Sequence, residues 1–196
     1  MKSPRTYTLK KRAETLAETR RRIVEAAVAL HSSVGPARTT FSMLAERAGV
    51  QRNTLYAHFP DEKSLLTACS GLAEQRDPMP DAAPWRRIQD WRERLLAGLP
   101  AIYSWYERNA DVLACVLRDA EHHQPTQEIA AQRFVPVFAA YAEVLGAKLN
   151  ARQRAVLGLA LSYHTWRTLV RQNGLKQAAA VSAMICAVDC AKDVKP

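Results

Sequence analysis

Apolar residues recur at helical spacing along most of the chain, beginning with the stretch from Glu14 to His31. The apolar positions in that stretch are Leu16, Ile23, Ala27 and Leu30. Pro36 cannot continue a helix, so the first helix should end near Ser32–Gly35. Strand-forming residues are not organised in the alternating runs of a half-buried strand. The pattern therefore predicts an all-α protein.

Three shorter helices are expected next. The second begins after Thr39–Thr40, either of which can cap it, and runs to Ala48. Gly49 then supplies a left-handed turn. The third helix covers about 51–58, and Pro60–Asp61 separates it from a fourth that runs to about Gln75.

The segment DPMPDAAP, from Asp77 to Pro84, has three prolines and no periodicity, which predicts a linker and a domain boundary. Helical spacing then resumes. It predicts helices at about 85–107, 109–120, 126–148, 151–172 and 176–192, for a total of about nine. The expected organisation is a basic arm at 1–13, a three-helix domain with a linking fourth helix at 14–75, and a helical domain at 76–196.

Charge is concentrated at the N-terminal end. Of a net charge of +9, residues 1–60 carry +7 from eleven Lys/Arg and four Asp/Glu, and the rest carries +2. A polyanion such as nucleic acid or a membrane surface would be attracted to this end. Residues 1–13 hold five basic and no acidic residues, which predicts a mobile arm that either touches phosphate or is simply a solvated tail.

Several functional classes find no support in the sequence. No apolar run approaches the roughly 18–20 residues of a membrane helix, and the N-terminus lacks the apolar stretch of a signal peptide. A cytoplasmic protein with no membrane partner is therefore expected. Gly-rich phosphate loops, HExxH pairs and nucleophile elbows are absent. We expect no cofactor, no metal site, no catalytic residue and no enzymatic activity.

The four cysteines are Cys69, Cys115, Cys186 and Cys190, and their spacing is not that of a disulfide framework or a zinc ribbon. Reduced thiols are expected. Cys186 and Cys190 share a helix face, so they could form half a thiolate site or a redox pair, or else be buried structural thiols.

The residues around Gly49 meet the needs of a helix-turn-helix. Ala45 is small enough for the helix crossing, Gly49 tolerates positive φ, and Val50 and Leu55 are apolar residues that bracket the turn. The second helix of such a pair enters the major groove. Its exposed face carries Gln51, Arg52, Asn53, Thr54 and Tyr56.

The chemistry of that face suits base recognition. Gln and Asn can bond adenine through two hydrogen bonds, Arg can do so to guanine, and Thr offers a hydroxyl or a methyl. Tyr56 and His58 can reach phosphate, although Tyr56 could instead serve for packing.

The stretch TTFSMLAERAGVQRNTLYAHFPDEKSLL, with the preceding TRRRIVEAAVALHSSVG, resembles the DNA-binding domain of the TetR (tetracycline repressor) family. The resemblance covers about residues 15–75, and its most specific part is AGV-x-x-x-x-LY-x-HF. It implies that Thr40 and Ser42 contact phosphate or bases. It implies that Arg52, Asn53 and Thr54 read bases while Tyr56 and His58 clamp the backbone.

Two positions depart from the family pattern. Gln51 stands where Ser or Thr often caps the reading helix, so it is expected to cap poorly and to point into the groove instead. Glu62 stands where many members have a phosphate-binding Lys, and a carboxylate repels phosphate. We therefore assign that phosphate contact to Lys63.

The resemblance further implies that the second domain binds a small ligand and dimerises through its last two helices. An aromatic cluster is the candidate ligand site, with plain core packing as the alternative: Tyr103, Tyr106, Phe134, Phe138, Tyr163 and Trp166. The candidate dimer residues, with burial inside the monomer as the alternative, are Leu159, Tyr163, Val170, Val181, Met184, Ile185 and Val188.

The function expected from these observations is that of a ligand-responsive transcriptional regulator. As a homodimeric repressor it would bind a near-palindromic double-stranded DNA operator and be released by a small molecule. One alternative is a helical small-molecule-binding protein or enzyme that carries a basic N-terminal domain. Another is non-specific nucleoid binding, which would show a steep salt dependence without sequence preference.

Overall fold

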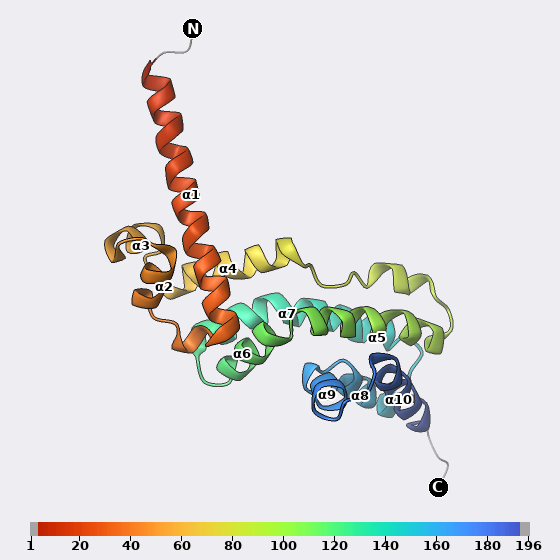
Figure 1. Ribbon diagram of the computed structural model, residues 1–196. Helices are drawn as coiled ribbons and strands as arrows, with labels where there is room; N and C mark the ends of the chain where they lie inside the picture. The colour runs from red at the N-terminus through yellow and green to blue at the C-terminus, as the bar shows by residue number, and fades with distance from the viewer. Residues whose placement is uncertain (1–3, 193–196) are drawn as a thin grey trace. The chain divides into compact units, whose positions relative to one another are not determined.

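The computed structural model describes residues 4–192, and every regular element among them is a helix (Figure 1). The all-α prediction is thereby confirmed. The chain divides into two compact units, residues 1–76 with 114–131 and residues 77–113 with 132–196. The first boundary lies within one residue of the predicted one, but residues 114–131, expected in the second domain, belong to the first unit.

The first unit begins with a long helix and three shorter ones. They are α1 (Pro4–Ser33), η1 (Pro36–Arg38), α2 (Phe41–Ala48), α3 (Arg52–His58) and α4 (Glu62–Arg76). The unit also includes parts of α6 (Ala110–Ala120) and α7 (Gln124–Leu145).

The predicted basic arm is helical from Pro4 onward, while its residues 1–3 lie outside the described chain. The high charge of this segment suggested a mobile arm, but helix propensity alone can make such a segment helical. The end of this segment, Leu9 to Ala13, consists of Leu, Lys, Arg and Ala, residue types that favour helix without tertiary contacts. Ion pairs one turn apart, such as Lys10 with Glu14 at 3.7 Å, add a little more.

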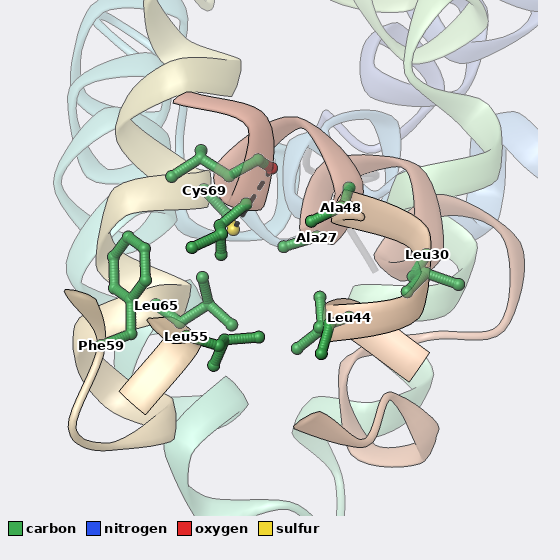
Figure 2. Close-up of a cluster of buried hydrophobic side chains, with 12 residues drawn as sticks. Ala27, Leu30, Leu44, Ala48, Leu55, Phe59, Leu65 and Cys69 are labelled. Carbon is green, nitrogen blue, oxygen red and sulfur yellow. Dashed lines mark hydrogen bonds between the residues drawn. The ribbon is translucent and has the colours of Figure 1, made fainter. Parts of the chain in front are cut away.

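A buried apolar cluster joins α1 to the helices that follow it (Figure 2). Its members include Ala27 and Leu30 from α1, Leu44 and Ala48 from α2, Leu55 from α3, the following Phe59, and Leu65 and Cys69 from α4. Burial raises the pKa of Cys69 to about 12, so this side chain stays a neutral thiol inside the cluster. The cluster fixes α2 and α3 on α1.

The second unit is also helical. It contains η2 (Ala83–Arg87), α5 (Trp91–Arg108), the remainder of α6 and α7, α8 (Ala151–Ala160), α9 (Tyr163–Trp166), the π-helical η3 (Arg167–Gln172) and α10 (Gln177–Cys190). No helix among residues 4–192 is long and apolar enough to cross a bilayer.

The single helix predicted at 151–172 is interrupted after Ala160, which gives ten α-helices in residues 4–192 where about nine were expected. Ser162 caps α9 by accepting a hydrogen bond from the His164 N–H. At the end of α8, the hydroxyl of Tyr103 donates to the Ala160 carbonyl at 2.9 Å and that of Tyr106 donates to the Leu161 carbonyl. These partners replace the helical hydrogen bonds that the interruption removes.

A buried carboxylate holds the loop before α2 to the end of α6. Asp119 is only 1% exposed, and it accepts hydrogen bonds from the Ala37 N–H at 3.0 Å and from Arg118 at 2.7 Å. Burial alone would raise the pKa of Asp119, but these hydrogen bonds outweigh it, and the pKa lies below its ordinary value. Gly35 has φ 98°, and a Cβ there would lie 2.4 Å from the Asp119 carboxylate, so the close approach requires glycine.

His31 is buried near the same carboxylate. Burial lowers the pKa of His31 to about 4, because a charged imidazole would lose its hydration, and the Asp119 charge offsets only part of this effect. The folded protein therefore keeps His31 neutral over most of the acidic range.

The stability of the protein should fall as the pH drops from about 6.5 to about 4, because the unfolded chain takes up a proton at His31 there and the folded chain does not. The loss from this residue is on the order of 3 kcal/mol. Urea unfolding at a series of pH values measures it. In His31→Gln this part of the pH dependence should disappear, and identical pH profiles for the two proteins would contradict the assignment.

Candidate nucleic-acid interface

The turn between α2 and α3 has the backbone that a helix-turn-helix requires. Thr40 caps α2 by accepting a hydrogen bond from the Met43 N–H at 3.2 Å. Gly49 ends α2 in the left-handed conformation, with φ 62° and ψ 41°, and the Val50 N–H donates to the Ala45 carbonyl at 2.9 Å. The chain then enters α3 at Arg52.

One face of α3 is anchored in the core and the other is free. Leu55 and the following Phe59 are fully buried. Gln51, Arg52 and Asn53 are exposed at the start of the helix, with Thr54 half-buried beside them. Gln51 makes no capping hydrogen bond within the described chain, as its residue type predicts, so its amide is available. The first turn of α3 thus presents three hydrogen-bonding side chains outward.

Tyr56 and His58 lie farther along α3. The Tyr56 ring packs 5.0 Å from the ring of Phe41, and the residue remains 44% exposed. Packing is therefore part of the role of Tyr56, and its phosphate contact stays a prediction. His58 is half-buried, and its carbonyl accepts a hydrogen bond from Arg20 at 3.2 Å.

The remaining predicted DNA contacts lie at helix starts. Thr40 and Ser42 are exposed at the beginning of α2, although the Thr40 hydroxyl is already engaged as a cap. The Lys63 ammonium donates to the Glu128 carboxylate at 2.6 Å, and this hydrogen bond raises the pKa of Lys63. A phosphate contact by Lys63 would have to displace Glu128.

Two arginines of α1 hold the helix-turn-helix, and the sequence pattern did not indicate this. Arg20 donates to the His58 carbonyl and lies over the Phe59 ring, 4.2 Å from its centroid. Arg22 donates to the carbonyls of Ala48 and Gly49, the second at 3.1 Å, and so caps the end of α2. The nearest signal was the position of Arg20, three residues before the buried Ile23 and hence beside the buried face.

The predicted ligand residues form one aromatic cluster in the second unit. Tyr103, Tyr106, Tyr163 and Trp166 are buried, while Phe134 and Phe138 are half-buried. The Tyr106 ring lies 5.6 Å from Tyr163 and 5.8 Å from Trp166. Burial raises the pKa of Tyr103 and of Tyr106. The four buried rings serve as core, and their role in ligand binding stays a prediction.

The predicted dimer residues separate into two groups. Tyr163, Val181 and Val188 are buried inside the second unit, which favours the alternative of burial within the monomer, and their role in a dimer stays a prediction. Leu159 is 60% exposed, and three more are partly exposed: Val170, Met184 and Ile185. This second group is available for a dimer interface.

The last two cysteines are exposed, so the alternative of buried structural thiols is wrong for Cys186 and Cys190. They share a hydrogen bond that raises the pKa of Cys190. Among the described residues, no group of three or more His, Cys, Asp or Glu side chains could hold a metal ion.

The family model of the bacterial regulatory proteins of the tetR family matches residues 23–69. Two curated relatives from Pseudomonas putida are each 33% identical over 97 residues, which is 48% of this chain: the HTH-type transcriptional regulator SrpR and the uncharacterized HTH-type transcriptional regulator TtgW. The matches span 45% of SrpR and 71% of TtgW.

The fold resembles solved structures over most of the chain. A tetR-family transcriptional regulator from Streptomyces coelicolor aligns with a TM-score of 0.61 at 17% identity, covering 89% of this chain and 80% of that one. At this identity the likeness concerns the fold alone.

Arg22→Ala should lower the free energy of unfolding by about 1–2 kcal/mol, because two carbonyls at the end of α2 lose a charged donor. The neighbouring Arg21→Ala is the matched control. Arg21 is exposed and pairs, among the described residues, with Glu18 and Glu25 on its own helix, so its loss should cost much less than that of Arg22. Urea denaturation compares the two, and equal losses would remove the capping role from Arg22.

Proposed function

The chain belongs to the TetR family of bacterial regulatory proteins, and from this premise we propose that it is a dimeric repressor that a small molecule releases from a near-palindromic operator. A transcriptional regulator of this family needs a surface that reads bases. The observation that carries the proposal is the exposed first turn of α3, on which Gln51, Arg52 and Asn53 point outward from an anchored helix.

Arg52 is the strongest candidate for reading a base. Its guanidinium can donate two hydrogen bonds to a guanine in the major groove, and Gln51 and Asn53 can do the equivalent with adenine. Leu55 and Phe59 hold α3 rigidly, so these side chains would meet the base edges without a large cost in ordering the backbone.

A two-fold dimer accounts for the reading of a near-palindromic site, because each half-site takes one α3. We place the dimer contact on α8 and α10, where Leu159 is exposed and Met184 and Ile185 are partly exposed.

We place the ligand at the aromatic cluster, with Phe134 and Phe138 as its accessible members. The residues of α6 run from Ala110, within the second unit, to Asp119, which binds the loop before α2. A shift of this helix on ligand binding would pull on that loop. The two copies of α3 must lie about one helical turn of DNA apart, so a small change in their separation would weaken operator binding.

Arg52→Ala should lower the affinity for operator DNA by about 1–3 kcal/mol and relax the preference at one base pair. Fluorescence anisotropy with the duplex upstream of its own gene, at physiological salt, measures this. Arg87→Ala, which removes an exposed arginine of the second unit, is the control and should bind like the wild type. If the wild-type protein forms no saturable, sequence-dependent complex, the proposed function fails.

Leu159→Glu should convert the dimer to a monomer in sedimentation equilibrium at micromolar concentration, because two carboxylates would be buried in the contact. Leu96→Glu introduces the same change at an exposed leucine of α5 and should leave the dimer intact. A dimer that survives Leu159→Glu would move the contact away from α8.

A further inference from the structure

Only part of α1 packs into the first unit. Its C-terminal portion contributes Ile23, Ala27 and Leu30 to the buried cluster, whereas every residue from Leu9 to Glu18 is exposed. Figure 1 shows the N-terminal turns of α1 extending past α2 and α3. We call residues 9–19 the α1 extension. At 1.5 Å per residue it reaches roughly 15 Å beyond the level at which Arg20 and Arg22 hold the helix-turn-helix.

The α1 extension continues the face of α1 that is buried farther along. Leu16 and Leu9 precede Ile23 by one and two heptads, so all three lie on nearly the same side of the helix. Leu9 is 61% exposed and Leu16 is 51% exposed. Arg20, on the flank of this face, contacts the end of α3. An apolar stripe therefore leaves the core beside α3 and runs on without cover from the described chain.

The α1 extension is also basic. Within the extension Lys10, Lys11 and Arg12 are basic and Glu14 and Glu18 are acidic, a net charge of +1, and residues 9–13 alone carry +3. Lys10 pairs with Glu14, but Lys11 and Arg12 form no ion pair with any described residue. The first turn of α1 contains no acidic residue, so the positive end of the helix dipole is not offset there.

Two occupants could cover an apolar stripe edged by basic residues, namely duplex DNA and a second copy of the chain. The three adjacent cations at residues 10–12 of each copy would oppose the pairing of two extensions at that end. The same charge is attracted to phosphates, and binding releases their condensed counterions. Charge complementarity and the position beside α3 both favour DNA.

We propose that the α1 extension binds the DNA that flanks the half-site read by α3. Arg12, on the flank of the stripe, contacts a phosphate, Lys11 on the other side of the helix adds positive charge near the duplex, and Leu9 and Leu16 face the sugars beside Arg12. This inference rests on the proposed function, because α3 must first place the duplex beside α1. Phosphate contacts of this kind add affinity and fix the register without reading sequence.

The test uses the full chain and the double variant Lys11→Ala/Arg12→Ala. The probes are two duplexes from the region upstream of the gene for this protein. The longer duplex is the full segment that the protein protects from hydroxyl radicals. The shorter duplex is the same segment without its outermost base pairs. On the longer duplex, the slope of log affinity against log salt should decrease by about 1 for each phosphate that the variant no longer neutralises. On the shorter duplex, the wild type and the variant should have equal slopes.

Arg87→Ala/Lys176→Ala is the matched control, since it removes two exposed basic residues of the second unit and should keep the wild-type slope on both duplexes. If the wild type binds its operator but the Lys11→Ala/Arg12→Ala variant keeps the wild-type slope on the longer duplex, the extension contact is overturned and the proposed function stands. If the wild type binds no duplex with sequence preference, both fail.

Sedimentation equilibrium tests whether a second copy of the chain, instead of DNA, covers the stripe. Leu9→Glu/Leu16→Glu should leave the sedimentation mass of the protein unchanged, because the stripe faces DNA only in the complex. A lower mass would show that the α1 extension pairs with a second copy, and this result would also overturn the proposal.

Discussion

The burial of Leu55 and Phe59 in the cluster built on α1 determines which side of α3 faces solvent. A helix of only seven residues has too few internal hydrogen bonds to be stable alone, so its orientation comes entirely from tertiary packing. Gly49 sets the angle at which α3 leaves α2, and Arg20 and Arg22 tie both ends of the motif to α1. The exposed row from Gln51 to Asn53 is the outcome of these constraints.

Much of this arrangement was predictable because its causes are local. The left-handed glycine, the capping Thr40 and the apolar spacing of the short helices are readable within a few residues. The roles of Arg20 and Arg22 were not, since their partners are backbone carbonyls 38 and 26 to 27 residues away, whose positions no side-chain pattern encodes. The ion pair of Lys63 with Glu128 spans 65 residues and was missed for the same reason.

The second unit shows the limits of periodicity. The spacing of apolar residues over 151–172 suits one continuous helix, yet tyrosine hydroxyls from α5 stabilise an interruption after Ala160. Apolar residues such as Val181 and Val188 suit a core and an interface equally well, because both environments exclude water. The sequence also does not distinguish basic residues that bind other parts of the protein, such as Arg22, from basic residues that stay exposed, such as Lys11.

The Asp119 carboxylate restrains the loop before α2. One buried negative charge satisfies both the Ala37 amide and the Arg118 side chain, so neither contact can loosen while the carboxylate stays desolvated. Gly35 packs closely against this carboxylate, since a Cβ at residue 35 would lie 2.4 Å from the Asp119 oxygen. Opening the joint would hydrate the carboxylate and release both donors together, so this contact is the point through which a movement of α6 would reach the loop.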